Sequence, residues 1–399
     1  MIRDTSRLVA EQFAETFGAP PEGVWSAPGR VSLMGDHTDI EDGLTLAHAT
    51  ERRSAVAMSR RDDSVVRVRT DLAGDVIETT LEQIVPPTEH AWYDYPLGTI
   101  WAAIEHIHSF NGELVDGDED ATLAPTGLDL FLTTDLPIGG GVASSASICG
   151  AVALALNDLW GFDLDAPRLA RLGYRVENNY VGASAGLADH IACLCAEEGK
   201  DVFFDARGSD VSLLDAPPLA DLGLEQLLVN SGENHRNWER VVADRHDACD
   251  RVAKALGYQY LREVKLEEFE AATNLDPVDR KRASYILTEI QRVLEITRVL
   301  RTDGAAHTGP IFNESQRSLR EDFEASTQRI DLITELALAS GALGARMTGS
   351  GFGGSVFVLI PADRVEEFRS NITEAFAEYG WNGLEVVTTS SADGPRRDA

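Results

Sequence analysis

A glycine-rich loop at residues 139–146 has the composition of a phosphate-binding turn. Glycine lets backbone amides approach an anion without interference from a Cβ atom, and a helix start offers unpaired N–H groups and a positive dipole end. Residues 148–156 are apolar on every side, so they predict a buried helix whose N-terminus points out of this loop. The loop has no lysine and is therefore not the lysine-containing P-loop pattern. The alternative is a plain turn ahead of a core helix.

The hydroxyl groups of this loop could also bind a cation. Mg²⁺ prefers oxygen and takes few protein ligands, so it could collect one oxygen here while it bridges nucleotide phosphates. We therefore predict a site for nucleotide phosphates and magnesium. The residues concerned are Gly139, Gly140, Gly141, Ser144, Ser145 and Ala146.

Two charged residues stand where their side chains could be fixed in place. Arg30 follows the turn-forming pair Pro28 and Gly29 and precedes the strand-like residues 31–34. Asp189 follows small and apolar residues, where a buried carboxylate is costly without a partner or a task. Each also fits a purely structural role, which is a surface ion pair for Arg30 and a helix cap or ion pair for Asp189.

Four segments occur in the order and spacing of one enzyme family. They are residues 27–39 (APGRVSLMGDHTD), the glycine-rich loop, residues 186–190 (GLADH) and residues 346–354 (RMTGSGFGG). Together they resemble the galactokinases, which are sugar-1-kinases of the GHMP superfamily, and residues 313–324 (NESQRSLREDFE) add to the likeness. Four motifs in one order are far more specific than any one of them.

The resemblance implies an ATP- and Mg²⁺-dependent enzyme with an aspartate at its centre. Asp189 matches the catalytic aspartate, which faces the anomeric hydroxyl of the sugar and can accept its proton. Arg30 is its expected partner, because a cation there keeps Asp189 ionised and neutralises charge on the moving phosphoryl group. Glu177 matches a glutamate that helps to hold magnesium, with Ser144 or Ser145 supplying the companion oxygen.

Other matched residues imply the sugar and nucleotide pockets. Asp36, His37, Asp39 and Gly186 correspond to sugar-binding positions. If the backbone is extended there, alternate members of the cluster 36–39 share a face and form a polar wall that suits sugar hydroxyls. The competing interpretation of this cluster is a His/Asp metal site.

Two aromatic residues, Trp92 and Tyr95, resemble the segment beside the adenine base, where an aromatic face can cover a purine. In other proteins an aromatic pair of this kind is more often part of the core.

The sugar pocket departs from the family pattern. Ser32, Asp36 and Ile40 stand where galactokinases usually have Asn, Glu and Tyr, and the family's glutamate meets the C6 hydroxyl. Ungapped alignment places Val242 where the family has a tyrosine that touches the sugar. Arabinose, N-acetylgalactosamine and galacturonate are therefore alternative substrates, although Asp36 would repel the carboxylate of galacturonate.

These observations predict an enzyme that phosphorylates the anomeric hydroxyl of galactose or a close relative. A rival from another class is a non-catalytic galactokinase-like sugar sensor, but a sensor has no need of the complete catalytic set. Mevalonate and homoserine kinases share the superfamily, and the polar wall fits a polyol better than their substrates.

Composition limits the partners. With 66 acidic against 35 basic residues the net charge is −31, which repels nucleic acid and acidic membranes, so we expect neither as a partner. The N-terminus lacks a signal-peptide core, and the four cysteines have no CxxC spacing, so a cytoplasmic protein with core thiols is expected. The sequence makes no prediction of the oligomeric state.

The pattern of elements predicts an α+β fold of two domains, residues 1–205 and 206–399. The resemblance to the galactokinases implies that these domains have the GHMP kinase architecture, with the active site in the cleft between them. Strands are expected at residues 55–58, 65–68, 226–229 and 355–360. Helices are expected from Asp165 and over residues 286–300, ending at Gly304. The acidic stretch 116–120 is predicted as a solvated loop, and residues 391–399 as a disordered tail.

Overall fold

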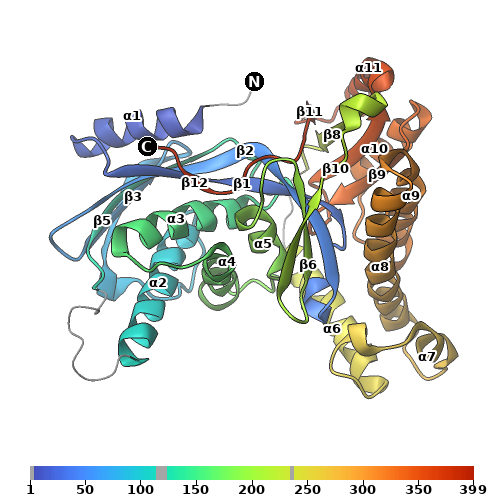
Figure 1. Cartoon of the computed structure of the whole chain (residues 1–399), viewed down its shortest axis with the longest axis horizontal. Helices are drawn as coiled ribbons and strands as arrows, with labels where there is room; N and C mark the ends of the chain where they lie inside the picture. Colours follow the sequence, from blue (N-terminus) through green and yellow to red (C-terminus); the bar gives the residue numbers. More distant parts are fainter. Residues whose placement is uncertain (1–3, 114–123, 234–237) are drawn as a thin grey trace.

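The computed structural model describes residues 4–113, 124–233 and 238–399 of the chain. Within these residues the fold consists of two sheets and the helices that cover them (Figure 1). The acidic stretch 116–120 lies outside the described residues. No helix among the described residues combines the length and the apolar character that crossing a membrane needs.

The larger sheet has eight strands and is built around the long pair β1 and β2. Its order is β12-β1-β2-β5-β3-β4, β6 pairs with β2 and β7, and every pairing is antiparallel except that of β3 with β5. Because β2 is 17 residues long, its first part pairs with β6 and its last part with β5. The strands are β1 (Gly23–Met34), β2 (Leu44–Arg60), β3 (Val65–Thr70), β4 (Ala73–Thr80), β5 (Leu128–Thr134), β6 (Lys200–Asp205), β7 (Asp210–Asp215) and β12 (Arg396–Arg397).

Helices cover both faces of this sheet (Figure 1). The first helix packs on one face through Val9 and Phe13, and four helices pack on the other. Among these four, α3 is surrounded by protein over most of its length, as its apolar sequence predicts. The helices are α1 (Thr5–Phe17), α2 (Asp94–Glu113), α3 (Ser144–Trp160), α4 (Ala166–Arg175) and α5 (Ala188–Leu194).

The smaller sheet has the antiparallel order β11-β8-β10-β9 and is covered by the helices of the second half of the chain. Its strands are β8 (Leu224–Asn230), β9 (Gly344–Thr348), β10 (Ser355–Pro361) and β11 (Glu385–Thr388). The remaining helices are α6 (Trp238–Ala255), α7 (Leu266–Ala271), α8 (Pro277–Thr302), α9 (Gly309–Ser318), α10 (Gln328–Ala339) and α11 (Val365–Glu378).

One hydrophobic core crosses the junction between the two sheets. Val31, Leu33 and Met34 at the end of β1 belong to the same buried cluster as Ile290 and Val293 of α8. The larger sheet therefore inserts the end of its central strand pair into the core of the smaller one. This insertion fixes where the turn after β1 stands.

The expected elements are present. The predicted strands lie within β2, β3, β8 and β10, and the predicted buried helix lies within α3. Asp165 caps α4 by accepting a hydrogen bond from the backbone N–H of Arg168 at 3.0 Å. The helix over residues 286–300 is α8, and the N–H of Gly304 donates to the carbonyl of Val299 just after it ends.

The division at residues 205/206 stays a prediction. In the strand pairing, β6 and β7 form a hairpin that belongs to the larger sheet, and the smaller sheet begins at Leu224. These pairings favour a division between Asp215 and Leu224.

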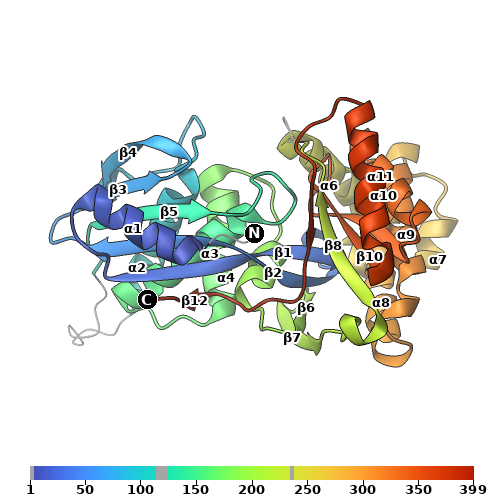
Figure 2. The same ribbon diagram turned by 90° about the horizontal axis from the view of Figure 1, so that it is seen from above.

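The expectation of a disordered tail at residues 391–399 is wrong. Figure 2 shows this segment running back from β11 along β1, where Arg396 and Arg397 form β12 opposite Ser26 and Trp25. The buried guanidinium of Arg53 donates to the carbonyls of Asp393, at 2.9 Å, and of Gly394. The polar composition of the tail suggested disorder because the sequence does not show that its hydrogen-bond partners lie on distant strands.

Candidate active site

A cleft of about 480 Å³ opens where elements of the two sheets meet. The larger sheet and its helices supply most of the wall, and α6 and the loop after β9 supply the rest. Most of the predicted site residues converge on it, namely Arg30, Asp36, His37, Asp39, Trp92, Tyr95, Gly139, Gly141, Ser144, Ser145, Glu177, Gly186 and Asp189.

Two predicted residues, Gly140 and Ala146, do not line the cleft. The N–H of Gly140 donates to the carbonyl of Pro137 at 3.0 Å, and its own carbonyl accepts from the hydroxyl of Ser355 at 2.6 Å. Ala146 is fully buried in the first turn of α3. Both residues shape the loop from behind.

Arg30 and Asp189 form a bidentate ion pair at the mouth of the glycine-rich loop. Nε of Arg30 donates to Oδ1 of Asp189 at 2.9 Å, and Nη2 donates to Oδ2 at 2.7 Å. Such paired contacts fix the geometry of both groups. The side chain of Arg30 is 5% exposed and that of Asp189 is 43% exposed, so the carboxylate faces the cleft rather than the close-packed spot expected from its neighbours.

The surroundings of Arg30 hold its charge and its position. Burial lowers the pKa of the guanidinium, but the carboxylates of Asp189 and Asp36 outweigh that effect and raise the pKa above its ordinary value. Nη1 donates to the carbonyl of Gly141 at 2.6 Å, and the backbone N–H of Arg30 donates to that of Val142 at 3.0 Å. The ladder of β1 and β2 is irregular between Pro28 and Arg30, and such bulges re-aim side chains.

The glycine-rich loop turns through left-handed backbone conformations before α3 begins. Gly141 has a φ of +75°, and a Cβ atom at this position would lie 2.6 Å from the carbonyl oxygen of Thr348. Ala143 also has a positive φ and precedes α3 without a side-chain cap, so the helix start is open to the cleft. The close approach to β9 explains why residue 141 is a glycine.

Glu177 lies against the hydroxyl of Ser145 and the ring of His190. It sits in the π-helix Val176–Val181 that continues α4. Burial raises the pKa of its carboxyl group, but His190, whose Nε2 is 3.0 Å away, and a hydrogen bond from Ser145 outweigh burial and lower the pKa. An ionised carboxylate beside a hydroxyl offers two hard oxygen ligands at the helix start.

This oxygen pair fits Mg²⁺ better than a metal that needs a full protein cage. Among the described residues, no group of three or more His, Cys, Asp or Glu side chains could hold a metal ion. Mg²⁺ keeps waters and substrate phosphates as ligands and takes only one or two from the protein. The same finding argues against the His/Asp metal site considered for residues 36–39.

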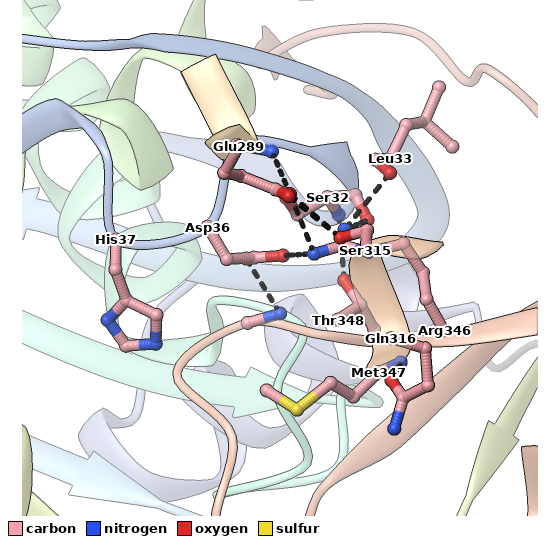
Figure 3. Close-up of polar contacts among 12 residues, drawn as sticks. Ser32, Leu33, Asp36, His37, Glu289, Ser315, Gln316, Arg346, Met347 and Thr348 are labelled. Atoms are coloured by element: carbon pink, nitrogen blue, oxygen red, sulfur yellow. Dashed lines mark hydrogen bonds and ion pairs between the residues drawn. The ribbon is translucent and has the colours of Figure 1, made fainter. Parts of the chain in front are cut away.

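A buried ion cluster, defined here as Asp36, Glu289, Arg292 and Arg346, holds the end of β1 against the smaller sheet. Figure 3 shows Asp36, Glu289 and Arg346 of this cluster. Nη2 of Arg346 lies 2.7 Å from Oδ2 of Asp36 and 3.4 Å from Oε1 of Glu289. Nη1 donates to the carbonyl of Leu33 at 3.0 Å. Arg292 pairs with Glu289 at 2.7 Å, so the cluster carries two positive and two negative charges.

The polar wall of residues 36–39 is not an extended strand as expected. The strand β1 ends at Met34, and the chain then turns, with His37 at a φ of +67°. Figure 3 shows Asp36 pointing at Arg346 and the ring of His37 pointing away from the ion cluster. The turn lets Asp36 pair with the buried cation of Arg346. The local sequence does not reveal this contact.

Asp39 joins the turn to the segment that carries Asp189. One of its oxygens accepts from the N–H of Ala188 at 2.9 Å. A Cβ atom on Gly186 would lie 1.8 Å from that same oxygen, so only glycine fits here. Burial raises the pKa of Asp39 to about 6, and the charge of Asp189 adds to the rise.

The structure adds lining residues that the sequence interpretation missed. His246 of α6 lies one helical turn after Val242, and both line the cleft. Residues 183–185 also line it, as does Ser350, which lies in the segment 346–354 that the sequence analysis named. The spacing of four residues from Val242 was the available signal for His246, but no helix was predicted over these residues.

Three family models match the chain. The galactokinase galactose-binding signature matches residues 11–60, the GHMP kinases N terminal domain matches residues 99–197, and the GHMP kinases C terminal model matches residues 306–378. The cleft residues from Arg30 to Asp39 fall in the first range, and those from Ser144 to Asp189 fall in the second.

Similar proteins cover nearly the whole chain. A galactokinase from Streptomyces coelicolor is 37% identical over 98% of this chain and 97% of its own. One from Mycobacterium bovis is 36% identical over 93% and 98%. The crystal structure of Lactococcus lactis galactokinase complexed with galactose superposes with a TM-score of 0.87 at 26% identity, covering 98% of this chain and 99% of that one. Mevalonate kinase from Methanococcus jannaschii, at 16% identity and a TM-score of 0.61, shares the fold.

The ion cluster generates a stability prediction. Replacing Arg346 by Met leaves Asp36 without its cation in a buried place, so we expect the free energy of unfolding to fall by about 3–5 kcal/mol. Urea denaturation measures this change. The matched control is Arg298→Met on the exposed side of α8, which should cost no more than about 0.5 kcal/mol. Equal losses for the two variants would contradict the role given to the cluster.

Proposed function

Because this chain belongs to the galactokinase family, we propose that it transfers the γ-phosphoryl group of ATP to the anomeric hydroxyl of galactose or a closely related sugar. The observation that carries the proposal is the bidentate pair of Arg30 and Asp189, which stands in one cleft with the glycine-rich loop. A phosphate cradle and a carboxylate that faces the same space are what a sugar kinase needs.

Asp189 is the proposed catalytic residue. Its carboxylate is partly exposed to the cleft and is kept in place by two hydrogen bonds from a cation. It accepts the proton of the anomeric hydroxyl as the anomeric oxygen bonds to the γ-phosphorus and the bond to the bridging oxygen of ADP breaks. Since phosphoryl transfer leaves little covalent work to the protein, position and charge dominate.

Arg30 has a double role in this proposal. Its charge favours the ionised form of Asp189 and offsets negative charge on the transferred group. Its contact with the carbonyl of Gly141 ties the catalytic pair to the phosphate loop. In a chain of net charge −31, this local cation and the open start of α3 favour the binding of an anionic nucleotide.

Glu177 and Ser145, with Ser144 beside them, are the residues that would hold Mg²⁺. When bound, the ion neutralises phosphate charge and orients the nucleotide. Trp92 and Tyr95 precede and begin α2 at the edge of the cleft and offer aromatic faces for the adenine.

Asp39, His37 and Gly186 form the proposed sugar pocket beside the catalytic pair. The Asp39 carboxylate lines the cleft and suits sugar hydroxyls, because a site built to bond hydroxyls rejects analogues that lack them. Asp36 was expected to contact the sugar, and we now assign it a positioning role, since both its oxygens are engaged by Arg346 and by the N–H of Gly349.

We further propose that the enzyme acts in the cytoplasm. The four cysteines, Cys149, Cys193, Cys195 and Cys249, are free thiols, which suits a reducing compartment.

The first test is release of ADP by the purified protein supplied with ATP, Mg²⁺ and a single sugar. We expect turnover with galactose, compared side by side with arabinose, N-acetylgalactosamine and galacturonate. Galacturonate should be the poorest, because the cleft places Asp39 and Asp189 where a substrate carboxylate would be repelled. Binding of sugar and ATP by calorimetry without turnover would instead support the sensor. The absence of both turnover and binding with every sugar of the panel would overturn both proposals.

The second test is removal of the catalytic charge. Asp189→Asn should reduce kcat by about 10²- to 10⁴-fold, since the amide cannot accept the proton. Asp215→Asn, which neutralises an exposed carboxylate paired with Lys200, serves as control and should retain full activity. Thermal melting shows whether both variants are folded. A near-normal kcat for Asp189→Asn would remove this role assignment.

The third test uses the raised pKa of Asp39. Because this carboxyl group has a pKa of about 6, it is ionised above pH 6 and accepts hydrogen bonds from hydroxyl groups, and it becomes protonated below pH 6. We expect the Kd for galactose to rise by about tenfold per pH unit below pH 6. Calorimetry without nucleotide measures it, since phosphate groups titrate in the same range.

Two variants locate this inflection. Asp39→Asn should bind galactose weakly with a Kd that is flat between pH 5 and pH 7. Asp201→Asn removes another buried carboxyl, with a pKa of about 7, that lies away from the cleft, and it should keep the inflection. If the inflection disappears in Asp201→Asn but persists in Asp39→Asn, it belongs to Asp201 and the assignment to Asp39 is wrong.

A further inference from the structure

Two histidines from different halves of the fold meet at the sugar side of the cleft. His37 belongs to the turn after β1, and His246 belongs to α6. Their rings lie edge to face with centroids 5.7 Å apart, and Nε2 of His246 is 3.5 Å from Nδ1 of His37. Both line the cleft beside Val242.

The contacts of His37 decide which nitrogen of each ring carries a proton. Nε2 of His37 is 3.1 Å from the carbonyl oxygen of Ser350, which only accepts, so Nε2 is the protonated nitrogen. Burial lowers the pKa of His37 and lowers that of His246 to about 3, so both rings are neutral at physiological pH. Nδ1 of His37 is therefore an acceptor, and His246 donates to it from Nε2.

This order of donors leaves one acceptor without a protein partner. A neutral His246 that is protonated at Nε2 has a lone pair on Nδ1, and no residue in the described part of the chain bonds to that atom. The neighbouring groups are already engaged. Asp36 binds Arg346 and the N–H of Gly349, and both nitrogens of His37 have partners.

We propose that His246 is a substrate-recognising residue whose Nδ1 accepts a hydrogen bond from one hydroxyl of the sugar. The proposal rests on the sugar-kinase function above and adds to it a residue of α6 that binds a sugar hydroxyl. Ser350 and His37 are positioning residues here, because they set the tautomer of His246 and hold its ring. Val242, one turn earlier on the same helix, provides the apolar wall beside it.

The chemistry of this acceptor defines the substrate class. A neutral ring nitrogen accepts from a hydroxyl but repels the oxygens of a carboxylate, so it selects an uncharged sugar. The loss of a single hydroxyl leaves the nitrogen unpaired in a half-buried place, which weakens binding of the deoxy analogue. The expected ligand is therefore a neutral sugar that retains that hydroxyl.

The test combines variants of His246 with galactose and its four monodeoxy analogues at the 2, 3, 4 and 6 positions. His246→Phe keeps a ring but has no acceptor, so the KM for galactose should rise about tenfold while kcat and the KM for ATP stay within about threefold. One analogue should already have a raised KM with the wild-type enzyme, and its KM should not rise further in His246→Phe. The hydroxyl that this analogue lacks is the one that His246 binds. His246→Gln keeps an acceptor and should recover part of the loss.

The controls separate this inference from the proposed function. Asp247→Asn changes the exposed neighbour on α6 and should leave every KM unchanged. An unchanged KM for galactose in His246→Phe, or equal further losses with galactose and all four analogues, overturns the role of His246 while the kinase function stands. If His246→Phe does not fold, the same comparison is made with His246→Leu, which also has no acceptor. No turnover of any sugar by the wild-type enzyme would overturn the function itself.

Discussion

The buried guanidinium of Arg346 is the constraint on which the geometry of the cleft depends. It lies between the carboxylates of Asp36 and Glu289 and also donates to the carbonyl of Leu33 near the end of β1. These contacts hold a strand of the smaller sheet against the end of the larger sheet. Ion pairs of this kind contribute little net stability against an apolar alternative, but each charge is costly to leave unpaired. The cluster therefore specifies one arrangement of the turn that carries His37 and Asp39.

The two halves of the fold divide the work at the cleft. The larger sheet and its helices contribute the phosphate loop, the pair of Arg30 and Asp189, and the oxygens of Glu177 and Ser145. The smaller sheet contributes little to the chemistry, but it positions the turn after β1, and α6 completes the wall with Val242 and His246. In the proposed function, the sugar pocket therefore draws on the turn after β1 and the segment before α5, which adjoin the strand and the helix of the catalytic pair, and α6 adds residues to the sugar wall alone.

The cleft has more acidic than basic side chains, as the whole chain does, but its phosphate end differs. The protein is strongly acidic, yet the phosphate end presents Arg30 and the open start of α3. Burial raises the pKa of two carboxyl groups nearby, but the net shifts differ. The pKa of Asp39 rises, whereas that of Glu177 falls because His190 and Ser145 outweigh burial. The charge of each carboxylate therefore depends on its partners as well as on how deeply it lies.

The sequence by itself determined several of the elements and indicated the proposed catalytic set. The apolar run of α3, the glycines before it and the motifs around Arg30 and Asp189 are local patterns, and local patterns reflect the conformations that neighbouring residues favour. Tertiary structure alone decided that Asp36 faces Arg346, 310 positions away (346 − 36), that residues 396 and 397 pair with β1, and that His246 reaches His37. Such pairings depend on buried charges and on strand edges that meet only when distant segments pack together, so no local pattern could reveal them.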